Sequence, residues 1–295
     1  MSASMGKPKF ITSFDGTQIA VYESGVKDAP TIFLFNGLGG SVDTWSSTVK
    51  HLSNQFHFVS FDYRGMFESG TPPYKNFSMD AHARDAQTVL EHFGVSSAVF
   101  VGWSMGVQVA LEVYSRVPNC CDALALINGV PAKLIDAVAP RLKRIVLLGM
   151  DLVALYYPVL KIYATPLTMS RVAVRAARAM RLLSSNVDER AFLNLAHEYI
   201  QLDFANYRDI VYEMAEHDAN HVLPSISVPT LIVGGTIDRI TPPAESRRMA
   251  EAIPNAELLM IEDASHYALV EYPDLINLRL ERFLECRTGK VSGPA

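Results

Sequence analysis

Short apolar runs alternate with helical segments along most of the chain, and this alternation constrains the fold more than any other feature. Runs such as Thr31–Phe35 and Ala123–Ile127 carry no charge and are typical of strands buried on both faces. Segments with helical spacing separate them, as between Ser78 and Phe93, where Gly94 is placed to end the helix. The pattern predicts an α/β fold with a mostly parallel central sheet flanked by helices.

This alternation has one interruption. It stops at Pro131, and from there to Val222 the sequence is helical without a strand-like run. It resumes with the strand-like runs Pro229–Val233 and Ala256–Ile261. We therefore expect an α/β core domain formed by residues 1–130 and 223–295, with residues 131–222 inserted as a helical lid.

Composition narrows the classes of protein to consider. The 295 residues are 49% hydrophobic and 19% charged, which is enough for one large domain with a sizeable core. The formal net charge of −5 argues against nucleic acid as a partner, because phosphate binding needs a basic field. The longest nearly apolar stretch, Ile145–Leu160, is shorter than the roughly 20 residues of a spanning helix. We expect a cytoplasmic protein without a stable membrane span.

The segment Gly-Trp-Ser-Met-Gly at residues 102–106 lies where a predicted strand ends and a helix begins. A serine in such a turn is held in a strained backbone conformation, and flanking glycines avoid the clash that results. The helix that follows presents backbone N–H groups to a developing oxyanion. This context favours Ser104 as a nucleophile over a serine that merely caps a helix.

A serine hydroxyl needs a base, and the base needs a carboxylate to orient it. His266 follows the last predicted strand, so its loop opens at the same sheet edge as Ser104. Two carboxylates compete to orient it. Asp238 follows the strand Pro229–Val233, whereas Asp263 lies only three residues before His266. We favour Asp238, because this architecture uses the chain order Ser, Asp, His.

The oxyanion needs two N–H donors. Met105 supplies one, and the glycine-rich loop after Thr31–Phe35 supplies the other through Leu38 or Gly37. Glycines in this loop let the backbone approach a substrate closely. We expect no metal and no organic cofactor in this chemistry.

At these residues the chain resembles the lid-bearing α/β-hydrolase superfamily of esterases, thioesterases, lactonases, C–C bond hydrolases and cofactor-free haloperoxidases. The resemblance covers about residues 10 to 284. The matching segments are Asn36-Gly-Leu-Gly-Gly, Asp62-Tyr-Arg-Gly, Gly102-Trp-Ser-Met-Gly, Val228-Pro-Thr-Leu-Ile-Val-Gly-Gly-Thr-Ile-Asp238 and Ser265-His266. The chain departs from the family at Asn36, where members often carry histidine. The resemblance implies a Ser104–Asp238–His266 triad, but it says little about the substrate.

We therefore expect a serine hydrolase that cleaves a carboxylic ester or thioester of an apolar acyl or aromatic substrate through an acyl-enzyme. Three alternatives stay open. The same triad serves C–C bond hydrolases and haloperoxidase-like perhydrolases. A lid that excludes water would make the protein an acyltransferase. A receptor that keeps the fold would bind a ligand without turnover.

The lid and the triad loops are expected to form the substrate pocket. Its predicted lining residues are mostly apolar, as is usual for pockets. They are Gly37, Trp103, Leu148, Leu152, Tyr156, Ile240 and Tyr267. A basic stripe also recurs at helical spacing in the lid, at Arg171, Arg175, Arg178 and Arg181. Such a stripe is usually a solvated face, and the alternatives are contact with an anionic acyl carrier or a membrane surface.

Overall fold

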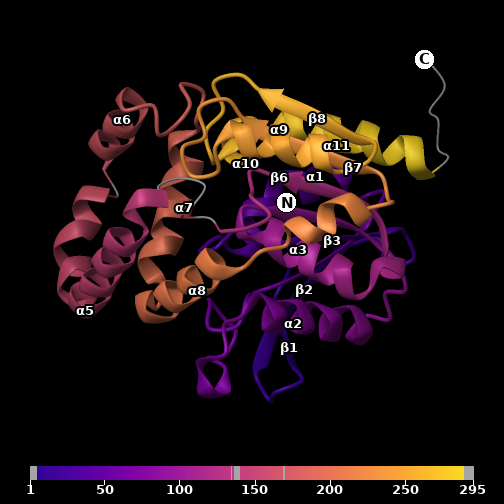
Figure 1. The fold of residues 1–295 in the computed structure, drawn as a ribbon, viewed down its shortest axis with the longest axis horizontal. Coiled ribbons are helices and arrows are strands. Elements are labelled where there is room, and N and C mark those ends of the chain that lie inside the picture. The colour runs from indigo at the N-terminus through magenta and orange to yellow at the C-terminus, as the bar shows by residue number, and fades with distance from the viewer. Residues whose placement is uncertain (1–4, 134, 136–139, 169, 289–295) are drawn as a thin grey trace.

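The sheet runs through the centre of the molecule (Figure 1). The structure is a computed structural model that describes residues 5–133, 135, 140–168 and 170–288. Its strands are β1 (Lys9–Thr12), β2 (Gln18–Gly25), β3 (Thr31–Phe35), β4 (His57–Phe61), β5 (Ala98–Trp103), β6 (Cys121–Ile127), β7 (Thr230–Gly235) and β8 (Ala256–Ile261). Within the described residues these form one eight-stranded sheet in the order β1-β2-β4-β3-β5-β6-β7-β8. The pairs β1–β2 and β2–β4 are antiparallel and the others parallel, which confirms the predicted sheet.

Helices cover both faces of the sheet because the central strands are apolar on both. In β3, Phe33 and Phe35 pack into one buried cluster, while Ile32 and Leu34 pack into the cluster on the opposite face. The first cluster includes side chains of α2 (Met79–His92), α3 (Met105–Arg116) and α9 (Pro243–Ala252). The second includes side chains of α1 (Ser46–Leu52), α10 (Ala268–Glu271) and α11 (Pro273–Thr288).

A group of helices lies between β6 and β7 in the sequence and to the left of the sheet in Figure 1. These elements are η4 (Pro140–Leu142), α5 (Lys143–Thr168), α6 (Arg171–Ala179), α7 (Glu189–Gln201), α8 (Phe204–Glu216) and η5 (Asn220–Ser225). The start and the end of this insertion meet at an isolated bridge between Ala132 and Asp218. Lys133 N–H also donates to the carbonyl of His217 over 2.8 Å. The chain therefore leaves and re-enters the α/β part at neighbouring points.

The parallel strands share one carboxyl edge, and the loops that leave this edge carry the predicted site. Ser104 follows β5 directly, Asp238 follows β7 and His266 follows β8. The glycine-rich loop at residues 36–40 follows β3, the neighbour of β5 in the sheet. Loops far apart in sequence are thus gathered at one place.

Candidate active site

Ser104 sits in a sharp turn between β5 and α3, with φ of 56° and ψ of −117°. Close packing makes glycine necessary on both sides of it. A Cβ on Gly102 would lie 2.5 Å from the carbonyl oxygen of Gly106, and a Cβ on Gly106 would lie 2.2 Å from that of Phe35. These contacts are with backbone, which cannot swing aside as a side chain does. The Gly-Trp-Ser-Met-Gly segment is therefore set by steric limits around a strained serine.

His266 lies between the serine and a carboxylate. Its Nε2 is 2.8 Å from Ser104 Oγ, and its Nδ1 is 3.0 Å from Asp238 Oδ2. The imidazole is 5% exposed. The indole N–H of Trp103 donates to the backbone carbonyl of His266 over 3.1 Å, which anchors this loop to β5. The structure thus brings Ser104, His266 and Asp238 into one hydrogen-bonded chain.

The Asp238 carboxylate is buried and fully engaged. Its Oδ1 accepts the backbone N–H groups of Ile240 and Thr241, and its Oδ2 accepts the hydroxyl of Thr241 as well as the bond from His266. Burial works to raise the pKa of Asp238. The interaction with His266 and the hydrogen bonds from Thr241 outweigh it and hold that pKa below its ordinary value. Asp238 is therefore an anion at neutral pH.

Asp263, the competing carboxylate, turns to the helical insertion instead. Its Oδ2 accepts the Ser185 hydroxyl at 2.6 Å, the Ser185 N–H at 3.2 Å and the Ser184 hydroxyl at 3.2 Å. The contact with His266 Nδ1 is made by Asp238, the carboxylate that the sequence favoured.

Two neighbours of Asp238 were missed in the sequence. The amide of Asn128 donates to Asp238 Oδ2 over 2.8 Å and to the carbonyl of Ser265 over 3.2 Å. The hydroxyl of Thr241 lies 2.6 Å from Asp238 Oδ2 and 3.2 Å from His266 Nδ1. The position of Asn128 offers a signal, because it comes directly after β6, at the edge that carries the other site residues.

The loop at residues 36–40 is fixed from three sides. The Asn36 amide donates to the Phe61 carbonyl over 2.9 Å, and its side-chain oxygen accepts the Trp45 indole N–H at 2.9 Å. From α7, the Tyr199 hydroxyl donates to the carbonyl of Leu38 over 2.8 Å. Asn36, the departure from the family pattern, thus anchors the loop through both ends of its side chain. Met105 opens α3, so its N–H has no partner within the helix and faces outward from the helix start.

Four of the predicted pocket residues gather around His266. A Cβ on Gly37 would lie 2.5 Å from the Trp103 ring, so this loop rests directly on the indole. The rings of Trp103 and Tyr267 lie 6.3 Å apart, and each is 5.7 Å from His266. Ile240 is joined to Asp238, the partner of His266, through its backbone N–H.

The structure does not bring Leu148, Leu152 and Tyr156 to this place. Their side chains are 60%, 53% and 57% exposed. The reason is the orientation of α5, which turns Leu147 and Met150 inward against the core cluster and Tyr157 toward α7 and α8. The residues on the opposite face of α5, which include these three, therefore point outward.

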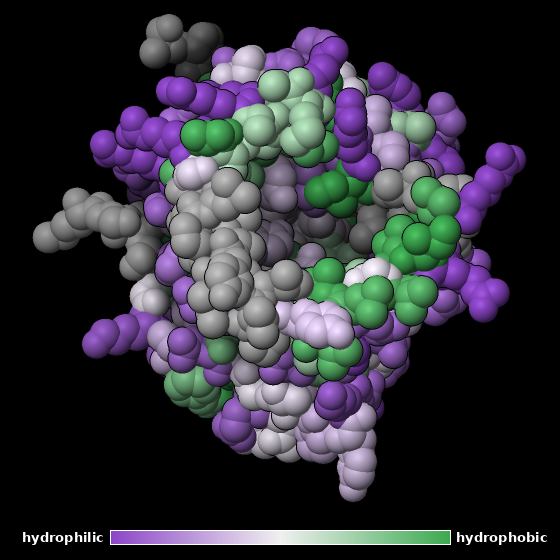
Figure 2. Space-filling view, turned by 90° about the vertical axis from the view of Figure 1, so that its left-hand side faces the viewer, coloured by the Kyte–Doolittle hydropathy of each residue, from purple (hydrophilic) through white to green (hydrophobic). Residues whose placement is uncertain are grey.

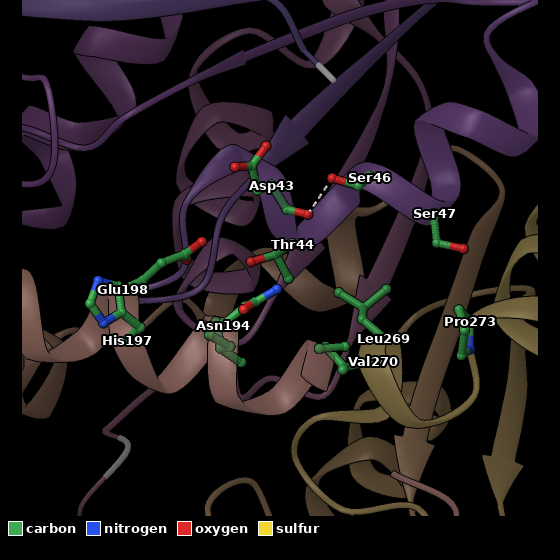
Figure 3. Close-up of a pocket in the computed structure, with 12 residues that line it drawn as sticks. Asp43, Thr44, Ser46, Ser47, Asn194, His197, Glu198, Leu269, Val270 and Pro273 are labelled. Atoms are coloured by element: carbon green, nitrogen blue, oxygen red, sulfur yellow. Dashed lines mark hydrogen bonds between the residues drawn. The ribbon is translucent and has the colours of Figure 1, made fainter. Parts of the chain in front are cut away.

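Two cavities lie close to the site residues. One, of about 890 Å³, is bounded by the segment after the glycine-rich loop, by α7 and by the α10 region (Figure 3). Asp43, Thr44 and Glu198 line its polar part, and Leu269 its apolar part. None of the predicted pocket residues is among its lining residues. The other, of about 320 Å³, borders Asp238 and is lined by Arg181, Thr236, Ile237, Asp238 and Arg239.

The chain is similar in sequence and in fold to several known proteins. The chain is 27% identical over 260 residues to the "putative carbamate hydrolase RutD" of Agrobacterium fabrum, covering 87% of this chain and 94% of that protein. It is 24% identical to the 3-oxoadipate enol-lactonase 2 of Acinetobacter baylyi, covering 88% and 91%. The crystal structure of the enol-lactonase from Burkholderia xenovorans superposes with a TM-score of 0.72 at 24% identity, covering 94% of this chain and 99% of that one.

A family model described as the alpha/beta hydrolase fold matches residues 30–273. That range contains Ser104, Asp238, His266 and every strand from β3 to β8. The chain belongs to the α/β-hydrolase fold family.

Proposed function

We propose that the protein is a serine hydrolase that cleaves a carboxylic ester or thioester through a Ser104–His266–Asp238 triad. The observation that carries this proposal is the hydrogen-bonded chain from Ser104 Oγ to His266 Nε2, at 2.8 Å, and from His266 Nδ1 to Asp238, at 3.0 Å. Both distances are those of a base in place to accept the serine proton and of a carboxylate in place to orient that base.

The reaction proceeds by two acyl transfers. His266 takes the Ser104 proton as the oxygen attacks the substrate carbonyl, and the Asp238 anion stabilises the imidazolium that forms. The backbone N–H groups of Met105 and Leu38 bind the oxyanion. The leaving alcohol or thiol then takes the proton from His266. In the second half, His266 activates water, which attacks the acyl-enzyme and releases the acid together with free Ser104.

The helical insertion is proposed to act as the lid over this site. Contacts from α7 support this, because Tyr199 holds the carbonyl of Leu38 and packs against Gly39. Phe192, also on α7, packs edge-on to Tyr267, with ring centroids 5.3 Å apart. Aromatic side chains from the insertion therefore meet those of the triad loops, which suits an apolar acyl or aromatic substrate.

Labelling with a fluorophosphonate probe tests the proposal. The wild-type protein is expected to form an adduct at Ser104, mapped by peptide mass spectrometry, and Ser104→Ala to form none. His266→Ala is expected to slow labelling by on the order of a thousandfold or more, because the serine loses its base. Labelling of Ser104→Ala at the wild-type rate would sink the proposal.

The substrate class is resolved by a panel of p-nitrophenyl esters of rising chain length, a thioester, an aryl carbamate and an enol-lactone. The last two are included because relatives carry the names carbamate hydrolase and enol-lactonase. We expect the highest kcat/KM for an apolar ester or thioester. Tight ligand binding by Ser104→Ala with negligible wild-type turnover would instead indicate a receptor.

A further inference from the structure

Exposed hydrophobic side chains are concentrated in one part of the insertion. Within the part of the chain that the structure describes, nineteen large hydrophobic side chains are exposed, and eleven of them lie between residues 142 and 182. Single exposed apolar residues are normal on a soluble protein, but a contiguous group marks a contact surface. Figure 2 views this side of the molecule and shows hydrophobic surface gathered beside a hollow, with hydrophilic side chains around the edge.

Four members of this group form a stripe along α5. Ile145, Leu148, Leu152 and Leu155 recur at intervals of three and four residues, so they share one helix face, and they are 53% to 69% exposed. The inward face of the same helix is held by Tyr157, whose ring stacks on Phe204 with centroids 4.9 Å apart. The helix thus buries one apolar side and presents another to solvent.

The sequence segment that carries this stripe is basic, whereas the rest of the chain is acidic. Residues 140–182 contain eight Lys and Arg residues and one acidic residue, Asp151, whereas the rest of the chain contains 18 basic and 30 acidic residues. Asp151 is engaged by the Tyr212 hydroxyl at 2.8 Å and by Arg208 at 3.6 Å. On α6, Arg171 and Arg175 are exposed beside Val172, which is 67% exposed.

These features select among the surfaces that could cover the stripe. A second copy of the chain packed face to face would bring two strongly basic segments together, which is unfavourable. An anionic acyl carrier would satisfy the arginines but has no need of a row of large apolar side chains along a helix. An anionic lipid surface satisfies both, because apolar side chains enter the acyl boundary while arginines contact the headgroups. Among the described residues no helix combines the length and apolarity needed to cross a bilayer, so α5 would lie along the surface.

We propose that the protein docks on anionic phospholipid bilayers through the outer face of α5 and α6. This docking face consists of Ile145, Leu148, Leu152, Leu155, Tyr156 and Val172 with Arg171 and Arg175. The inference rests on the surface alone and is independent of the reaction proposed above.

Vesicle co-sedimentation of the full chain tests this docking. We expect binding to vesicles of phosphatidylcholine with phosphatidylglycerol, weakening as salt is raised, and little binding to phosphatidylcholine alone. Arg171→Gln and Arg175→Gln are each expected to lower the partition coefficient about fivefold, the equivalent of about 1 kcal/mol per charge. Leu148→Gln with Leu152→Gln is expected to lower it about tenfold or more.

A matched control uses exposed leucines elsewhere. Leu258 on β8 and Leu278 on α11 are 40% and 49% exposed, and Leu258→Gln with Leu278→Gln is expected to leave vesicle binding unchanged. Unaltered thermal unfolding midpoints show that every variant is folded. Three results would overturn the proposal: no binding to anionic vesicles at low salt, equal loss in the control, or a lipid-free dimer that Leu148→Gln with Leu152→Gln dissociates.

Discussion

Ser104 has a positive φ, which a residue with a side chain adopts at a cost of about 1–3 kcal/mol. The surrounding backbone keeps it there. Its N–H donates to the Ile127 carbonyl over 3.0 Å, and its own carbonyl accepts the N–H of Val107 at 3.0 Å. Because Ile127 belongs to β6 and Val107 to α3, the turn cannot relax without losing its bond to one of these elements. The strain is therefore maintained by the fold, and it leaves the hydroxyl directed at His266.

Asp62 is a single residue whose protonation is controlled by its burial in the fold. Its carboxyl is 1% exposed, and burial raises its pKa to about 7, although the Tyr22 hydroxyl and the Glu68 N–H donate to Oδ2. Within the described residues, Oδ1 has no hydrogen-bond partner. The folded protein therefore holds this proton through a pH range in which an unfolded chain, with a pKa near 3.8, has released it.

The consequence is a loss of stability as pH rises. From about pH 4 upward the unfolded state binds fewer protons at this residue than the folded state, so its contribution to the free energy of unfolding, roughly 4 kcal/mol in all, is lost as pH rises through the folded pKa of about 7 and levels off about one unit above it. Asp62→Asn removes the titration but keeps an acceptor for Tyr22. Urea unfolding of both proteins across this range is expected to show that the stability of the wild type relative to Asp62→Asn falls as pH rises. A pH-independent difference between the two would contradict the prediction.

At the scale of elements, α7 connects the insertion to the sheet edge that carries Ser104. Tyr199 donates to Leu38, and the Glu198 carboxylate accepts the N–H of Ser41 at 3.2 Å. Both contacts fall on the loop that supplies the proposed second oxyanion donor. The position of α7 therefore bears on the orientation of the Leu38 peptide group.

Tyr199→Phe tests this connection. The variant leaves the Leu38 carbonyl without its partner, and we expect kcat on a short ester to fall about tenfold with a small change in KM, because the oxyanion donor loses its support. Tyr157→Phe is the matched control, since Tyr157 also donates to a backbone carbonyl, that of Ile200, over 3.0 Å. Steady-state kinetics are measured for both variants. An equal fall in kcat in Tyr199→Phe and Tyr157→Phe would contradict this expectation.

At the scale of the whole molecule, the sheet and the insertion differ in how much they bury. Every residue of β5 is buried, and its side chains pack into both large clusters. In α6, Val174 is the buried residue, and it packs into a small cluster with Leu183 and Val187. The local free energy of opening is expected to follow this difference.

Hydrogen–deuterium exchange measures that free energy element by element. Amides of β3, β5 and β6 are expected to exchange through global unfolding, whereas those of α6 exchange through smaller openings and at least about tenfold faster. Equal protection of α6 and β5 would show that the insertion and the sheet open as one unit.

Much of the fold was predictable because its signals are local. Apolar runs located β3 and most of β6, since a strand segment buried on both faces has no room for charge. The shared carboxyl edge of parallel strands then brought Ser104, Asp238 and His266 together in the prediction. The outward orientation of the predicted pocket residues on α5 was not predictable, because that helix is apolar on both sides and the sequence alone does not say which side is buried.

The sequence by itself determined the order of elements, the strained turn at Ser104 and the loops that carry His266 and Asp238. These follow from backbone geometry and periodicity, which act over a few neighbouring residues. Only the tertiary structure decided that Asn128 and Thr241 hold Asp238, that Asp263 faces the insertion, and that one apolar face of α5 is left outside. The contacts of Asn128 and of Asp263 join segments that lie 110 and 78 to 79 residues apart in the sequence, so no local pattern specifies them.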